Sequence, residues 1–167
     1  VYKRQVGNGA GTITATTAAS VAQATTIEGF SNSGANTYNI TDTAANLAGS
    51  SNAVLTLAGT VTASDTATAS QANTIAGFSK AVVYSISDTA TNVAAASSTA
   101  LNEAVNITAT GTATSSETVT LLGAANTGTT TIDAASMTAA QAVALTFNGT
   151  GNDTITSLTV TDTATVA

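Results

Sequence analysis

The chain has 167 residues, of which 7% are charged and 4% are aromatic, and it contains no Cys, His, Trp or Pro. The absence of Cys excludes disulfides, thiol nucleophiles and thiolate metal sites, and the absence of His removes the commonest general base and transition-metal ligand. Nine carboxylates against three basic residues give a net charge of −6, so nucleic acid is an unfavourable partner and cations are favourable ones.

Small side chains dominate the composition, with Thr and Ala as the most frequent residues. Such a chain has few large groups for one deep core, whereas stacked repeats bury small side chains between neighbouring units. No apolar run approaches the ~20 residues that a membrane-spanning helix needs, so we expect no membrane span.

The first five residues, Val1–Gln5, differ from the rest, because they hold two of the three basic residues. They resemble the translation of a transposon adapter used in preparing sequencing libraries. That resemblance implies a non-native segment and a metagenomic fragment; a native basic N-terminal edge is the alternative.

The first regular elements follow at residue 12. Residues 12–16 alternate Thr with apolar residues, which predicts a half-buried strand. Residues 18–28 carry apolar side chains at every third position and predict a short helix. Gly29 follows that helix as the left-handed residue that commonly ends one.

The second strand is predicted over 37–41, with Asp42 as the N-cap of a helical turn at 44–48. The remaining predicted strands are 54–62, 80–87, 105–110 and 129–133. The remaining predicted helices are 63–76, 90–104, 115–122 and 137–145.

An internal repeat organises the chain. The segment Tyr38–Ala48 returns as Tyr84–Ala94, 46 positions later, and more weakly as 160–164. We therefore expect residues 6–147 to form repeats of about 46 residues, each with two strand-helix coils. The expected equivalent core positions are Ile13, Ile40, Leu57, Ile86, Ile107 and Ile132.

The polar residues of the repeated segment favour structural roles. We expect Asp42, Asp88 and Asp162 to cap the helices that follow them, rather than to bind cations. Asn46 and Asn92 recur at one place, where they either tie adjacent coils together or lie exposed on a helical turn.

These features predict an α/β repeat solenoid with parallel strands and short helices, similar in type to leucine-rich repeats. The alternative is an all-β parallel β-helix or β-roll, which the Thr content favours. Ala-rich segments favour the α/β form.

One stretch, Asn148–Thr156, resembles a single unit of the calcium-binding nonapeptide repeat of RTX proteins. The resemblance implies Gly149, Gly151 and Asp153 as Ca²⁺ ligands, with Ca²⁺ as the one cofactor, and residues 148–167 as the start of an RTX-like or further repeat. Ca²⁺ takes six to eight oxygens, so one unit is incomplete without others. An ordinary polar turn is the alternative.

Thr-x-Thr pairs suggest a further binding mode. Outward threonine ladders resemble the ice-binding surface of some antifreeze proteins, although Thr is also a favourable residue for any solvated strand face. The pairs are Thr12/Thr14, Thr60/Thr62, Thr108/Thr110, Thr118/Thr120 and Thr159/Thr161.

The repeated segments resemble the Ala/Thr-rich tandem repeats of large bacterial, cyanobacterial-type secreted surface proteins that are associated with RTX hemolysin-type repeats. That resemblance implies an extracellular or cell-surface location and an S-layer-like or adhesive role. Its partners would be neighbouring repeats, other surface proteins or polysaccharide. Because no base, nucleophile and orienting group converge in the sequence, we expect a non-enzymatic structural or adhesive segment.

Overall fold

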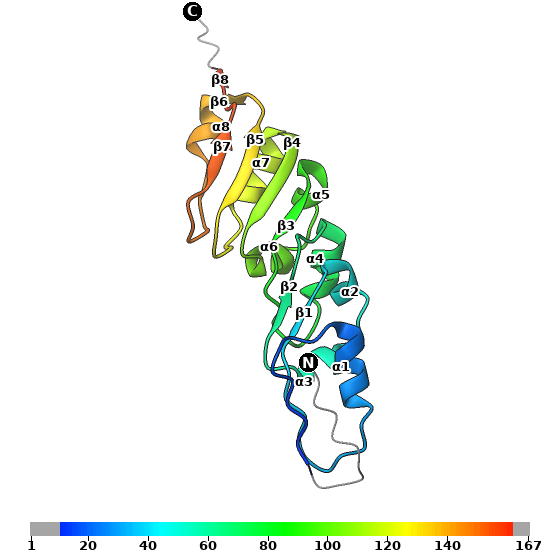
Figure 1. The fold of residues 1–167 in the computed structure, drawn as a ribbon. Helices are drawn as coiled ribbons and strands as arrows, with labels where there is room; N and C mark the ends of the chain where they lie inside the picture. The colour runs from blue at the N-terminus through cyan, green and yellow to red at the C-terminus, as the bar shows by residue number, and fades with distance from the viewer. Residues whose placement is uncertain (1–10, 162–167) are drawn as a thin grey trace, which may run out of the picture.

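The computed structural model describes residues 11–161, which form an elongated α/β molecule. Its helices and strands follow one another along the long axis in chain order, from α1 at one end to β8 at the other (Figure 1). The predicted adapter-derived segment and Asp162 lie outside the described residues. No helix within 11–161 is long and apolar enough to span a bilayer.

The strands are short, and every pair is parallel. They form a β1-β2 sheet, a β3-β4-β5-β7 sheet and a β6-β8 pair. The strands are β1 (Ile40–Asp42), β2 (Val61–Ala63), β3 (Ile86–Thr89), β4 (Ile107–Ala113), β5 (Thr130–Ala134), β6 (Met137–Thr138), β7 (Thr154–Thr156) and β8 (Val160–Thr161).

The helices are one or two turns long, and most begin at a Ser or Thr whose hydroxyl accepts an amide of the first turn. Isolated helices of this length are unstable in water, so packing must hold them. They are α1 (Val21–Glu28), α2 (Ala44–Ala48), α3 (Asn52–Leu57), α4 (Ala69–Ile75), α5 (Ala90–Ala94), α6 (Ser98–Glu103), α7 (Ser115–Leu122) and α8 (Ala139–Val143).

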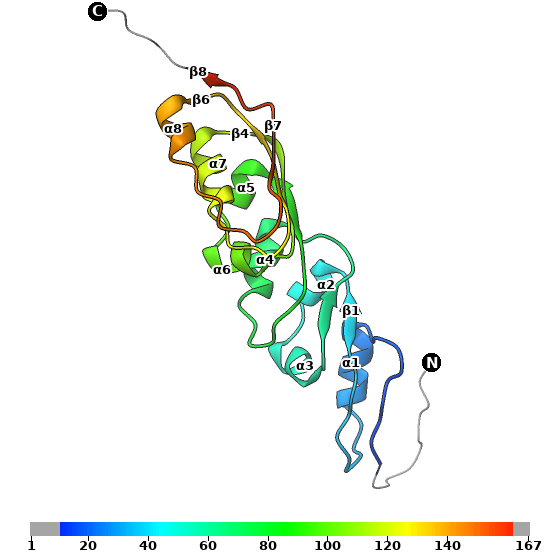
Figure 2. The ribbon, with the colours of Figure 1, turned by 90° about the vertical axis from the view of Figure 1, so that its left-hand side faces the viewer.

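Each paired strand lies beside the strand that follows one crossover later. Ile40 pairs with Val61 and Ile86 with Ile107, each 21 residues along, and Ile107 pairs with Thr130, 23 residues along. Isolated bridges such as Thr62 with Val83 continue the parallel pairing between the first two sheets. In Figure 2, α5, α7 and α8 lie on one side of the strands.

The core runs along the molecule between strands and helices. Its strand residues Ile40, Val61, Ile86, Ile107 and Ile132 are fully or almost fully buried. Helix residues such as Ala, Leu and Ile face them. Small inward side chains let successive crossovers lie close together, as the composition predicts.

The repeated tyrosines make the same contact in both copies of their segment. The Tyr38 hydroxyl donates to the Val54 carbonyl at 3.1 Å, and the Tyr84 hydroxyl donates to the Ala100 carbonyl at 2.8 Å, each 16 residues further on. Both rings are buried, so each hydroxyl needs such an acceptor. Each tyrosine thereby fixes the helix that follows it to the core.

The α/β class and the parallel strands agree with the sequence prediction. The predicted helix 115–122 coincides with α7, where Thr114 and Glu117 form a capping box. The predicted strand 54–62 is wrong in its first half, because residues 52–57 form α3. A short apolar run fits one helical turn as well as a strand.

Two consequences concern core positions. Leu57 is 55% exposed at the end of α3, so its predicted core place belongs to Val61. Ile132 lies opposite Ala109 rather than Ile107, because the register shifts in the middle of β4.

Helix ends also differ from expectation. The predicted helix 90–104 is broken into α5 and α6, because Ser97 caps a new start by accepting the Ala100 amide at 3.1 Å. Gly29 has φ −73°, so the predicted left-handed helix end is wrong. Among the described glycines, Gly111 in β4 has the positive φ, +73°.

Candidate functional site

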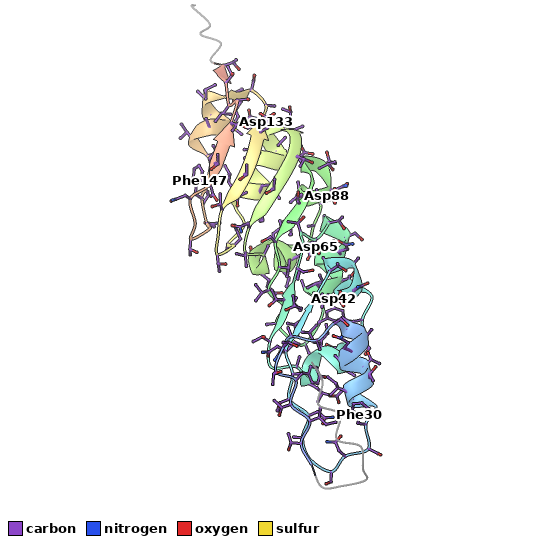
Figure 3. All side chains as sticks on the ribbon, in the orientation of Figure 1. Phe30, Asp42, Asp65, Asp88, Asp133 and Phe147 are labelled. Atoms are coloured by element: carbon purple, nitrogen blue, oxygen red, sulfur yellow. The ribbon has the colours of Figure 1, made fainter. Side chains whose placement is uncertain are left out.

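Three aspartates at the ends of successive strands form what we call the aspartate row: Asp42, Asp65 and Asp88. Each carboxylate accepts the first amide of the preceding crossover's helix. Figure 3 shows these residues, followed by Asp133, succeeding one another along the molecule. The bonds are Val21 N–H to Asp42 Oδ2 (2.9 Å), Ala44 N–H to Asp65 Oδ1 (2.6 Å) and Ala69 N–H to Asp88 Oδ2 (3.1 Å).

The row corrects the predicted capping role of Asp42 and Asp88. The N-caps of α2 and α5 are Thr43 and Thr89, whose hydroxyls accept from Asn46 and Asn92 amides. The aspartates instead satisfy a free amide of a neighbouring helix, 21 and 19 residues earlier in the chain. Sequence spacing shows which residue precedes a helix but cannot show which helix end lies beside it.

The other oxygen of each carboxylate is held within its own turn. Asp42 Oδ1 accepts from the Thr43 amide and from Asn46 Nδ2, each at 2.8 Å. Asp88 Oδ1 makes the same two bonds with Thr89 and Asn92, at 2.8 and 2.9 Å. The repeated asparagines thus orient an aspartate instead of reaching the next coil themselves.

These hydrogen bonds favour the charged form of the carboxylates. Burial acts to raise the pKa of Asp42, but hydrogen bonds from Asn46, Val21 and Thr43 together hold that pKa below its ordinary value. The Asn92 side chain is the main cause that lowers the pKa of Asp88, against a smaller effect of burial. The row is therefore ionised at neutral pH and oriented toward backbone amides.

Other asparagines do connect successive crossovers through their side-chain carbonyls. Asn39 Oδ1 accepts the Thr60 amide, and Asn106 Oδ1 accepts the Thr129 amide, each at 2.9 Å. Asn52, Asn73 and Asn102 make equivalent bonds to Ser79, Ser97 and Ala125. The expectation of asparagine ties was correct in kind and wrong in the residues chosen.

Two Asn-x-Gly turns share one geometry that the sequence prediction missed. The Asn32 side chain donates to Gly34 and to Gly11, and the Asn126 side chain donates to Gly128 and to Val105. In each case the second acceptor lies 21 residues earlier. The spacing Asn-x-Gly was the available signal, since the glycine lets the turns approach closely.

The predicted calcium residues lie together in the turn before β7. A Cβ on Gly151 would lie 2.2 Å from the Gly128 carbonyl, so this glycine is required by contact with the earlier turn. Gly149 packs against Asn126, and Asp153 Oδ1 accepts the Thr130 amide at 3.0 Å. The turn has one carboxylate, and one of its oxygens is already paired, so the turn alone does not fit the oxygen cage of Ca²⁺.

The remaining acidic side chains come from separate elements. Glu28, Glu103 and Glu117 belong to α1, α6 and α7. Across residues 11–161, no three carboxylate, thiol or imidazole side chains gather closely enough to hold a metal ion. Lys80, whose Nζ donates to the Gly59 carbonyl at 2.8 Å, also serves a contact between crossovers.

Hydroxyls line the outer face of the larger sheet. Ser87, Thr108, Thr131 and Thr154 lie opposite one another in register, and we call them the threonine row. The row is not continued evenly toward the N-terminus, where Thr62 pairs with Val83. The predicted pair Thr118/Thr120 lies on α7 instead of a strand, and Thr118 is buried.

No protein-family model matches the chain, and neither does any curated protein sequence or solved structure with which it was compared. The residues and their contacts are therefore the basis for inferring what the chain does.

Proposed function

We propose that the chain is a non-enzymatic structural or adhesive segment of a large secreted or cell-surface bacterial protein. Its fold is proposed to be a leucine-rich-repeat-like α/β solenoid, whose coils of about 23 residues pair into the 46-residue sequence repeat. The resemblance to Ala/Thr-rich surface repeats supports the location. The aspartate row is the observation that carries the structural role.

The polar side chains in this account serve stacking. Asp42, Asp65 and Asp88 each satisfy a backbone amide of the preceding crossover. Asn39 and Asn106 do the same from the other end of their strands. Residue types that elsewhere perform catalysis are here paired with backbone groups, as a load-bearing rod of stacked coils requires.

The outer face supplies the adhesive part of the proposal. The threonine row repeats a hydroxyl at the spacing of neighbouring strands, about 4.8 Å. Hydroxyls both donate and accept hydrogen bonds, which suits the hydroxyls of a polysaccharide. The acidic balance of the chain favours neutral or cation-bridged polysaccharides over strongly acidic ones.

Retention on insoluble cellulose, chitin and cross-linked dextran tests this role. We expect the purified chain to be retained on at least one of them, and the variant Thr108→Val/Thr131→Val to be retained less. Asn102→Ala, a change away from the row, is the matched control for altered surface chemistry. Equal retention of wild type and row variant, or no retention on any matrix, contradicts the adhesive role.

Ice binding is the second candidate, because the threonine row presents hydroxyls in register on four adjacent strands. Thermal hysteresis of the purified chain measures it directly. A hysteresis that Thr108→Val/Thr131→Val abolishes would favour ice over polysaccharide, and its absence would remove this candidate.

A further inference from the structure

The last crossover leaves an apolar end surface that the earlier crossovers do not have. We define the C-terminal end surface by Val143 on α8, Phe147 in the following loop and Val160 on β8, which are 87%, 55% and 49% exposed. Helix α8 has no buried residue, whereas every other helix has at least one. Phe147 lies near this end of the molecule in Figure 3.

The same end carries an open strand edge. Within residues 11–161, β7 pairs with β5 on one side only, and β8 pairs with β6 alone. Ile155 on β7 is only partly buried, while Ile107 and Ile132 on the preceding strands are completely buried. An open edge beside exposed apolar side chains is a template for another strand.

The opposite end offers a surface of the matching kind. Residues 13–15 pair in parallel with the strand at Thr37 on one side, through Ala15 N–H to the Thr37 carbonyl and Thr37 N–H to the Ile13 carbonyl. The Thr14 amide has no partner within the described part of the chain, and alternation along a strand directs it to the open side. Ile13 and Ala15 are only partly buried, and Phe30 lies exposed at this end (Figure 3).

We propose that the C-terminal end surface binds the first crossover of a second copy, head to tail, with the strand at residues 13–15 added in parallel beside β7. Every strand pair within the molecule is parallel, and this arrangement continues that direction. In a longer protein the next coil of the same chain would occupy this surface. The contact is heterologous, so it does not close on itself and copies can add in series.

This surface follows from the strand order and burial, so its occupancy does not depend on the adhesive role proposed above. Two variants separate the two ends. Val143→Glu/Phe147→Glu places charges on the C-terminal end surface at exposed positions. Thr14→Pro removes the outward amide without removing a hydrogen bond of the described structure.

Sedimentation velocity of the 167-residue chain over a wide range of concentrations gives the test. We expect the mass of the wild type to rise with concentration beyond that of a dimer, and each variant alone to remain at 16.1 kDa, the mass of one chain. An equimolar mixture of the two variants should form a one-to-one dimer, because each retains the surface that the other lacks.

Three outcomes overturn the proposal: a monomeric wild type at all concentrations, a mixture that stays monomeric, or a Thr14→Pro variant that dimerises by itself. The last outcome indicates pairing between two C-terminal end surfaces. Far-UV circular dichroism checks that both variants keep the fold. If Thr14→Pro does not, Phe30→Glu replaces it in the same mixture, with the same expected dimer.

Discussion

The Asp42 carboxylate accepts a hydrogen bond from the Val21 amide over 2.9 Å, although 21 residues separate the two in the chain. The contact joins the end of β1 to the start of α1. Asp65 with Ala44 and Asp88 with Ala69 repeat it further along the molecule. Side chains that look like helix caps for their own turn thus hold adjacent crossovers together.

Removal of one carboxylate of the row should destabilise the fold. Asp88→Ala deletes the acceptor of the Ala69 and Thr89 amides and of Asn92 Nδ2. We expect a loss of about 1–2 kcal/mol in the free energy of unfolding, measured with urea. Glu103→Ala, a change of an exposed carboxylate on α6, should stay within about 0.5 kcal/mol of wild type. Equal losses in both variants would contradict a special role for the row.

Acid should weaken the fold through the same residues. The carboxyl pKa of Asp42 and of Asp88 lies below its ordinary value of 3.8 in the folded chain. A lowered folded-state pKa adds stability that is present above the ordinary value and is lost as the pH falls through the folded-state pKa. We expect the free energy of unfolding to fall below about pH 4, and to fall less in Asp42→Asn/Asp88→Asn. An unchanged pH dependence in that variant would count against the assignment.

The two candidate core positions near β2 should differ sharply on truncation. Ile107→Ala empties a completely buried site, so we expect a loss of about 2–5 kcal/mol. Leu57→Ala trims a side chain that is 55% exposed, so its effect should stay below about 1 kcal/mol. Urea unfolding of both variants checks this, and comparable losses would restore the sequence prediction that Leu57 is a core residue.

Close contact between turns predicts an effect of adding one methyl group. In Gly151→Ala the new Cβ would lie 2.2 Å from the Gly128 carbonyl, so a turn must shift, at a cost of about 1–3 kcal/mol. Gly111→Asn is the comparison, because no atom lies within 4 Å of a Cβ there and Asn tolerates its positive φ of 73°. Thermal unfolding should rank Gly151→Ala as the less stable variant. The reverse order would show that the turns at 128 and 151 do not pack as described.

Calcium binding should be weak in this chain. The turn that holds Gly149, Gly151 and Asp153 has one carboxylate, and the Thr130 amide already donates to it. We expect calorimetric titration with Ca²⁺ alone to give at most weak heat, with no change in the thermal unfolding midpoint. Tight binding that Asp153→Asn abolishes would contradict this expectation and support the RTX resemblance.

The sequence predicted most where a signal is local. Helix α7 was found with its correct bounds, because Thr114, Glu117 and Gly123 mark its two ends. The strands at Ile40 and Ile107 were located by their alternating pattern. These signals depend on neighbours within a few residues, and no distant contact overrides them.

Contacts between crossovers were harder to predict. Asp65 was not included among the repeated aspartates, because its surrounding sequence lacks the tyrosine and asparagine of the other two copies. Its carboxylate nevertheless reaches the Ala44 amide. The pairing of Ile132 with Ala109 depends on a register shift within β4, which has no local sequence signature beyond Gly111.

A double-mutant cycle on Val21 and Asp42 tests the stacking role most directly. Val21→Pro removes the amide donor at the first helical position, where proline is well tolerated, and Asp42→Ala removes the acceptor. If the two residues are bonded across crossovers, the losses of the single variants should exceed that of the double variant by about 1 kcal/mol. Additive losses would show that the aspartate does not hold the two crossovers together.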